Sequence, residues 1–202
     1  MSIKKSFIFA WLIIIGSGIA SVFWYQEWKY SLPTPVPPNY HAINSGTYVS
    51  IKGIPGLENS SKPLFLHFFN PNCPCSRFNI SHFKSLVKEY GHKIDFAVVA
   101  LTSNKKYTEK DIQEKFDLAL PVVFDSSYAA ACGVYSTPQA AVIKTDKSLY
   151  YRGNYNKSRY CTDKETNYAR IAIDGLLAEQ KQLRLDSAAT VSYGCTLPTC
   201  KK

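Results

Sequence analysis

The stretch Leu64-Phe-Leu-His-Phe-Phe69 is an almost uninterrupted apolar run, and Asn72-Cys-Pro-Cys-Ser-Arg77 follows it closely. Such a run is typical of a strand that is buried on both faces of a sheet. Pro74 suits the first turn of a helix, because the N–H that proline lacks would have no partner there. Asn72 is expected to cap the same helix. The sequence therefore predicts a strand that leads into a helix, with two cysteines at the junction.

Strands and helices are predicted to alternate outward from this junction. The predicted strands cover residues 64–69, 94–101, 121–124, 139–143 and 148–152, the last two as a hairpin around 145–147. Four helices are predicted. The first has Phe83, Leu86, Val87 and Tyr90 on its apolar face and ends at Gly91, and the second begins with a capping box at 108–111 and runs to Phe116. The third is short, from Ser126 to Cys132, and is closed by Gly133, and the fourth begins with a capping box at 162–165. This order predicts a small α/β domain with a mixed sheet.

Composition and charge fit a globular chain. The 202 residues are 46% hydrophobic and 19% charged, which excludes a wholly disordered protein. The formal net charge is +9, but no run of lysine and arginine exceeds two residues. We therefore expect a mildly basic surface and no nucleic-acid partner.

The N-terminus predicts a membrane anchor. Residues 7–25 contain no charged side chain, and Lys4 and Lys5 precede them. We assign residues 1–5 to a cytoplasmic end and 6–25 to a transmembrane helix, which leaves the rest outside the cytoplasm, in the periplasm if the protein is bacterial. A cleaved signal peptide is the alternative, because Gly18-Ile-Ala20 has the small-x-small pattern of a cleavage site. In both cases the main part of the chain is exported.

The rest of the chain divides into three predicted parts. Residues 26–44 are a proline-rich linker, expected to be extended and to hold the domain away from the membrane. Residues 45–180 form the folded domain. Residues 181–202 form a cysteine-containing tail without a strong period.

The chemistry is predicted at Cys73. A thiol at the start of a helix lies near the positive end of the helix dipole and near N–H donors, which favours the thiolate. Arg77 is one turn away and could add to this effect. We therefore expect Cys73 to be an accessible nucleophile.

These motifs together resemble the thioredoxin superfamily. The resemblance covers residues 47–178 and Gly194-Cys195, and it rests on the cysteine pair, on Gly133-Val-Tyr-Ser-Thr-Pro138 before a strand, and on Tyr151-Arg-Gly153. The membrane-tethered extracytoplasmic branch, which includes TlpA/ResA-like proteins and AhpC/TSA redoxins, is the most similar. This resemblance implies a three-layer thioredoxin-like fold and a thiol–disulfide oxidoreductase that needs no cofactor. Its partners would be protein thiols or disulfides.

The resemblance also implies roles for particular residues. Cys73 matches the attacking cysteine, and Pro138 matches a proline with a cis peptide bond after Thr137, in a loop that binds extended substrate backbone. The residue-level alternative for Thr137 and Pro138 is an ordinary turn into a strand. His67 lies six residues before Cys73, where thioredoxins carry a buried acid that transfers a proton to the resolving cysteine. A histidine could do this near neutral pH, or it could be a core residue bonded to a backbone carbonyl.

Two features depart from the family pattern. One residue separates Cys73 from Cys75, so Ser76 occupies the usual resolving position, and Asn72 replaces a tryptophan. A disulfide between Cys73 and Cys75 would need distorted geometry, which favours an oxidising or isomerising protein or a resolving cysteine elsewhere. The candidates for a resolving or structural disulfide are Cys161, Cys195 and Cys200, the last two separated by a short loop. Cys132 is interpreted as a small buried apolar residue.

The sequence leaves three alternative functions open. A thiol peroxidase would oxidise Cys73 to sulfenic acid, but Pro71 lies too near Cys73 for the peroxiredoxin motif and Asn70 occupies its threonine position. A Cu(I)-binding module would use Cys73 and Cys75 with His82 or another cysteine, although Cys-Pro-Cys alone is a poor metal motif and we assign no metal site. A static disulfide on an inert fold is the third.

Overall fold

The computed structural model describes residues 3–103, 107–158 and 160–197, except for the side chain of Cys75. Its contacts divide the chain into two compact units, Met1–Pro33 and Thr34–Lys202.

The first unit is one long apolar helix, α1 (Ile3–Ser31). Its span from Lys4 to Ser31 has 28 residues and a mean hydropathy of 2.1, which is long and apolar enough to cross a membrane. The helix extends beyond its predicted end at Tyr25 and includes residues 26–31 of the predicted linker. It ends just before Pro33, because proline disfavours the helical conformation of the residue before it.

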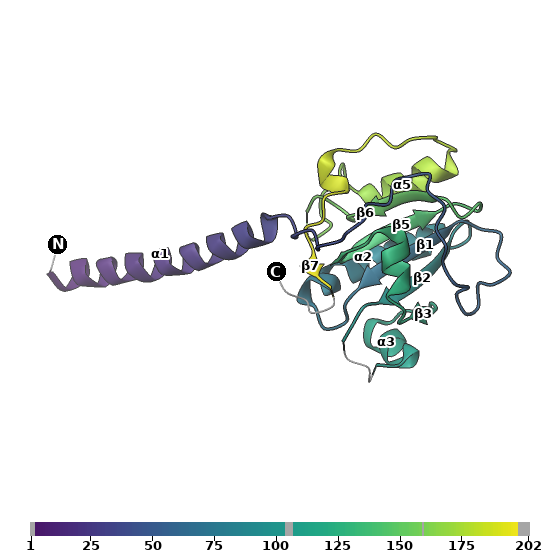
Figure 1. Ribbon diagram of the computed structural model, residues 1–202. Coiled ribbons are helices and arrows are strands. Elements are labelled where there is room, and N and C mark those ends of the chain that lie inside the picture. The colour runs from purple at the N-terminus through teal and green to yellow at the C-terminus, as the bar shows by residue number, and fades with distance from the viewer. Residues whose placement is uncertain (1–2, 104–106, 159, 198–202) are drawn as a thin grey trace. The chain divides into compact units, whose positions relative to one another are not determined.

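The second unit is built on a mixed five-stranded sheet (Figure 1). Its strands are β1 (Leu64–Phe69), β2 (Asp95–Ala100), β3 (Val122–Val123), β5 (Gln139–Ile143) and β6 (Leu149–Gly153), in the spatial order β3-β2-β1-β5-β6. β1, β2 and β3 are parallel, whereas β5 is antiparallel to both β1 and β6. The predicted thioredoxin-like α/β fold with a mixed sheet is therefore confirmed.

In the described part of this unit, four helices and a small second sheet accompany the main sheet. The helices are α2 (Pro74–Tyr90), α3 (Glu109–Phe116), α4 (Ser127–Cys132) and α5 (Tyr168–Leu177), with a short 3-10 helix, η1 (Ser187–Ala189). β4 (Ser136–Thr137) pairs with β7 (Cys195–Thr196) in a separate two-stranded sheet.

β1 supplies side chains to a core on each face of the sheet. Phe65 and Phe69 lie in one core, together with apolar residues of α2, α3 and α5. Leu66 and Phe68 lie in the other core with α4, and Cys132 is fully buried there, as predicted. Because both faces are covered, the strand carries apolar residues at nearly every position.

His67 is the polar exception in this strand. Its side chain is fully buried, and its ring stacks on Phe83 with the centroids 4.4 Å apart. Its Nδ1 forms a hydrogen bond of 2.6 Å with the Tyr155 hydroxyl. Burial lowers the pKa of the imidazole from 6.5 to about 3, since a buried cation would lose its hydration.

Of the two predicted capping boxes, the structure confirms one and contradicts the other. The capping box of Thr108 and Asp111 is confirmed, since each side chain accepts a hydrogen bond from the other residue's N–H. The capping box predicted at 162–165 is wrong, because α5 begins only at Tyr168 and the Asn167 side chain accepts from the Arg170 N–H. The Asp163 carboxylate instead accepts N–H bonds within its own turn.

The segments before and after the predicted domain are parts of the fold. The Tyr40 hydroxyl donates to the Gly133 carbonyl oxygen (2.8 Å), so the residues assigned to a spacer lie against the domain. In the tail, the Asn154 amide donates to the carbonyl oxygens of Ala188 (2.7 Å) and Val191 (2.6 Å). The structural unit thus extends beyond the predicted limits of 45 and 180, and residues 34–44 are not a free spacer.

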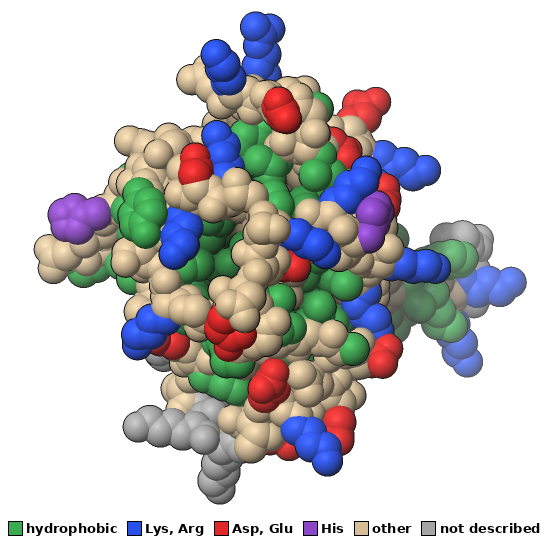
Figure 2. All heavy atoms as spheres, turned by 90° about the vertical axis from the view of Figure 1, so that its right-hand side faces the viewer, with side chains coloured by type: hydrophobic (Ala, Val, Ile, Leu, Met, Phe, Trp, Pro, Cys, Tyr) green, Lys and Arg blue, Asp and Glu red, His purple; other side chains and the backbone are tan. Residues whose placement is uncertain are grey.

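Charges of both signs are mixed on one face of the molecule. On the face shown in Figure 2, lysine and arginine side chains are interspersed with aspartate and glutamate. This distribution agrees with the scattered basic residues of the sequence.

The buried neutral His67 predicts a pH-dependent stability. The unfolded chain binds a proton at this residue below about pH 6.5 and the folded chain does not, so the free energy of unfolding should fall as the pH falls from about 6.5 towards 3. His67→Gln should remove about 1.4 kcal/mol per pH unit from this slope between pH 6 and 4, measured by urea unfolding. His92→Gln, the same substitution at an exposed position, is the matched control. Identical slopes for His67→Gln and the unmodified chain would contradict the prediction.

Candidate redox site

Cys73 lies where β1 leads into α2. It is the N-cap residue of α2, and Pro74 occupies the first turn as predicted. The Cys73 N–H donates to the Asn70 carbonyl oxygen (3.0 Å), and the Ser76 N–H donates to the Cys73 carbonyl oxygen (3.1 Å). These bonds fix the backbone of the junction and place the Cys73 sulfur at the positive end of a 17-residue helix.

The polar residues around the junction have structural roles. Asn72 was predicted to cap the helix, but its side chain bonds elsewhere. Its amide nitrogen donates to the Thr102 hydroxyl (3.3 Å), and its amide oxygen accepts from the Tyr107 hydroxyl (2.8 Å). Ser76, in the position that the resemblance gives to a resolving cysteine, is buried and accepts from the Asn70 N–H (3.1 Å). Ser76 thus stabilises the turn.

Cys73 is disulfide-bonded and fully buried. The expectation of an accessible sulfur is therefore wrong for this state of the molecule. The backbone of Cys75 belongs to α2, but its side chain lies outside the described residues, and so does the predicted pairing of Cys73 with Cys75.

Two further elements meet at this site. The peptide bond between Thr137 and Pro138 is cis, as the resemblance implied, and it joins β4 to β5. β7 pairs with β4 so that Cys195 lies opposite Thr137. The Cys195 sulfur is 3.0 Å from the Cys73 sulfur. The structure thus brings together Cys73, Cys195 and the Thr137–Pro138 corner, which are far apart in the sequence.

The other cysteines differ in their surroundings. Cys161 donates to the Asn79 side-chain oxygen (2.6 Å), and burial raises the pKa of its thiol to about 12. Burial also raises the pKa of Cys132 to about 12. Both thiols therefore stay protonated at neutral pH and are poor nucleophiles. Cys195 carries a thiol that contacts the Cys73 sulfur, and the predicted short bridge from Cys195 to Cys200 lies outside the described residues because Cys200 does.

His67 is neutral in this environment. Burial lowers its pKa to about 3, well below the neutral range in which the expected proton transfer would take place. Its hydrogen-bond partner is the Tyr155 hydroxyl, not a backbone carbonyl, and its Nε2 has no partner within the described part of the chain. No pattern in the sequence indicates Tyr155 as this partner.

The metal-binding alternative gains no support from His82. Its Nε2 forms a hydrogen bond with the Asn167 side-chain oxygen (2.9 Å), at the start of α5. Within residues 3–103, 107–158 and 160–197, three or more His, Cys, Asp or Glu side chains do not gather in a group that could hold a metal.

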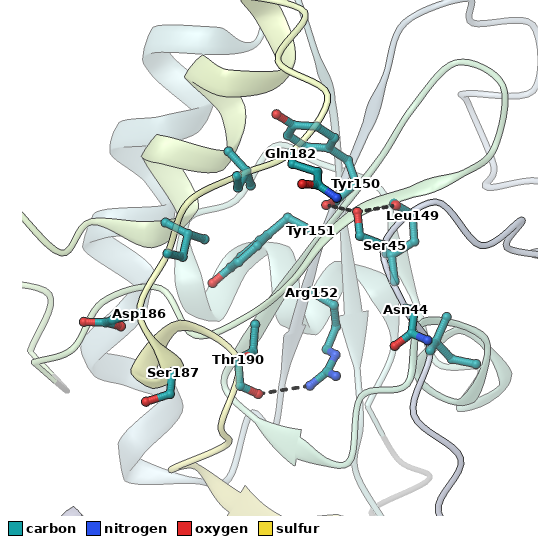
Figure 3. Close-up of a pocket in the computed structure, with 13 residues that line it drawn as sticks. Asn44, Ser45, Leu149, Tyr150, Tyr151, Arg152, Gln182, Asp186, Ser187 and Thr190 are labelled. Atoms are coloured by element: carbon teal, nitrogen blue, oxygen red, sulfur yellow. Dashed lines mark hydrogen bonds between the residues drawn. The ribbon is translucent and has the colours of Figure 1, made fainter.

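A separate cavity of about 480 Å³ lies between β6, residues 43–45 and residues 182–190 (Figure 3). Polar groups on its wall bond within the fold: the Ser45 hydroxyl donates to the Tyr150 carbonyl oxygen (2.9 Å), and Arg152 donates to the Thr190 carbonyl oxygen (3.2 Å). Its lining contains no cysteine. It is therefore distinct from the cysteine site.

The sequence reasoning missed three residues that hold the Cys195 strand in place. These residues are Thr34, Gln139 and Ser192. The sequence signal for them is weak, since the tail offers only Gly194-Cys195 and Cys200 as recognisable features.

Comparisons with solved structures agree with the fold. A hypothetical protein from Sinorhizobium meliloti is similar with a TM-score of 0.61 and 18% identity, over 77% of this chain and 94% of that one. An uncharacterised protein from Geobacillus kaustophilus is similar with a TM-score of 0.55 and 21% identity, over 75% and 93%. At these identities the likeness shows the fold alone.

A more distant match is the thioredoxin domain of a thiol–disulfide oxidoreductase from Bacteroides vulgatus, with a TM-score of 0.47 and 14% identity over 60% of this chain and 96% of that one. No curated protein matches the sequence. One family model does match, over residues 47–199, which is most of the chain. Its description is "Domain of unknown function (DUF6436)", and this chain belongs to that family.

Proposed function

We propose that this protein is a membrane-anchored, extracytoplasmic thiol–disulfide oxidoreductase that acts through Cys73. The observation that carries the proposal is the disulfide-bonded Cys73 at the N-terminus of α2. When this disulfide is reduced, the helix dipole and the N–H groups of the first turn stabilise a thiolate at that position. A stabilised thiolate is both the attacking form of cysteine and a good leaving group.

The proposed reaction is exchange between sulfur atoms. The Cys73 thiolate attacks one sulfur of a substrate disulfide, forms a mixed disulfide and expels the other substrate sulfur as a thiolate. Cys75 then attacks the Cys73 sulfur, which releases the reduced substrate and leaves an oxidised pair in the protein. The reverse sequence oxidises a substrate dithiol. Because electrons pass only between sulfurs, the reaction needs no cofactor.

The corner of Thr137 and Pro138 is the proposed substrate-binding edge. β4 ends at Thr137, next to the cysteine site, and its main chain already pairs with an extended segment there. Backbone pairing of this kind binds peptides of many sequences, because the hydrogen bonds come from main-chain groups. Protein thiols or disulfides are therefore the expected substrates.

Cys73→Ser should lower the rate of disulfide exchange at least 100-fold, since serine cannot form a mixed disulfide. The measurement is the reduction of a protein disulfide by dithiothreitol with catalytic amounts of the full chain in detergent. Cys161→Ser is the control, because the Cys161 thiol donates to the Asn79 side-chain oxygen and burial keeps it protonated, and it should keep the rate. Exchange that survives in Cys73→Ser would refute the proposal.

The same variants test the peroxidase alternative. Consumption of hydrogen peroxide with a thiol reductant should be slow and should not depend on Cys73. Rapid consumption that is lost in Cys73→Ser would favour a thiol peroxidase instead.

The location of the domain is a separate prediction. If α1 stays as an anchor with Lys4 and Lys5 in the cytoplasm, protease added to spheroplasts of a bacterial host should digest the domain, and the intact chain should fractionate with membranes. A cytoplasmic protein of known location is the protection control. A domain that resists protease until the cells are lysed would contradict the predicted location. A mature chain that lacks residues 1–20 would favour a cleaved signal peptide over a retained anchor.

A further inference from the structure

The C-terminal segment covers the cysteine site. Cys73 is fully buried, and Cys195, which is 3% exposed, contacts it sulfur to sulfur. A substrate protein cannot reach a sulfur that is fully buried. Any exchange at Cys73 must therefore begin with the sulfur that is already in contact or with movement of the segment.

This segment is extended and pairs with the edge proposed for substrate. Thr196 lies opposite Ser136 and Cys195 lies opposite Thr137, in an antiparallel pair of strands. The chain thus presents a cysteine to Cys73 from an extended strand beside β4. This is the arrangement in which an extended peptide would offer its own cysteine for exchange.

Several contacts hold the segment in this position. The Thr34 N–H donates to the Ser192 carbonyl oxygen (2.7 Å), and the Thr34 hydroxyl donates to the Gly194 carbonyl oxygen (2.5 Å). The Gln139 amide donates to the Ser192 hydroxyl (2.6 Å), and both of these side chains are fully buried. The segment therefore has a specific binding site on the domain.

Gly194 permits the C-terminal segment to lie close to the backbone of Thr137. A Cβ atom on this residue would overlap the backbone of Thr137, including its carbonyl oxygen. Only glycine allows the two main chains to lie this near each other without a shift of one of them. The position of Cys195 against Cys73 thus depends on the residue before it.

We propose that Cys195 is a third redox-active cysteine, an internal exchange partner that its strand delivers to Cys73 in the place of an extended substrate. The proposal rests on the proposed function of Cys73. In the exchange, Cys195 loses its proton to solvent and its thiolate attacks the Cys73 sulfur. A Cys73–Cys195 bond forms, the bond between Cys73 and its first partner breaks, and that partner leaves as a thiolate that takes up a proton. The number of disulfides does not change.

The distance fits this step. The two sulfurs are 3.0 Å apart, whereas a disulfide bond is about 2.05 Å long, so the atoms are in contact but not bonded. A small approach would form the bond. By contrast, Cys161 contacts Asn79 and Cys132 lies in the core with α4, so neither has this access to Cys73.

The test uses the full chain with Cys75→Ser, purified in detergent, reduced and then exposed to oxidised glutathione. If Cys195 is the internal partner, mass spectrometry of unreduced digests should find the Cys73–Cys195 linkage as the main product. Addition of Cys161→Ser should leave this product unchanged. Glutathione attached to Cys73 beside an unlinked Cys195, or a linkage of Cys73 to a different cysteine, would overturn the proposal.

A second variant tests the position of the strand without removing a sulfur. Gly194→Val in the Cys75→Ser chain should displace the strand and lower the yield of the Cys73–Cys195 linkage at least tenfold, with glutathione on Cys73 instead. Thr34→Val, which removes one bond to the strand, should lower the yield less, and it replaces Gly194→Val if that variant does not fold. An unchanged yield in both variants would overturn the role of the strand.

The two proposals fail in different experiments. Exchange that persists in Cys73→Ser refutes the oxidoreductase function itself. Exchange that depends on Cys73 but occurs without a Cys73–Cys195 linkage refutes only the role of Cys195.

Discussion

The central position of β1 is the constraint on which the rest of the structure depends. This strand pairs with β2 on one side and β5 on the other, and its side chains enter the cores on both faces of the sheet. The chain must therefore leave the sheet at a defined point after Phe69, where α2 begins within a few residues. β5 starts directly after Pro138, and its first residue, Gln139, pairs with Phe68 near the end of β1. This pairing therefore also places β4, which ends at Thr137, near the end of β1 where α2 begins. The site is a consequence of this register.

The site is completed from both ends of the domain. Thr34 is the first residue of the second unit, and Ser192 and Gly194, which it contacts, lie near the end of the chain. Neither segment forms a long strand or helix of its own here, and their order comes from hydrogen bonds to each other and to Gln139. Such bonds are satisfied only when both segments are in place, so the segment that follows the apolar helix and the tail support one another.

The accuracy of the sequence predictions followed the range of the interactions involved. The limits of β1 were predicted correctly, because a strand buried on both faces needs apolar residues throughout. The Thr108 capping box was also predicted correctly, because its hydrogen bonds are local. The capping box at 162–165 failed because Asp163 had an equally local alternative in a turn. The burial of Cys73 and the pairing of Cys195 with Thr137 could not be predicted, because both depend on contacts between residues more than fifty positions apart. A tail without periodicity gives no signal of such pairing.

The electrostatics of the covered site are consistent with its oxidised state. A disulfide carries no charge, so Cys73 can be fully buried without the cost of removing a charged group from water. A Cys73 thiolate in the same position would keep the favourable helix dipole, worth about 1 kcal/mol, but would lose hydration worth several kcal/mol. His67, the buried imidazole of β1, is neutral for the same reason. The covered arrangement therefore fits a disulfide, and a catalytic thiolate at Cys73 requires the covering segment to move so that water reaches the sulfur.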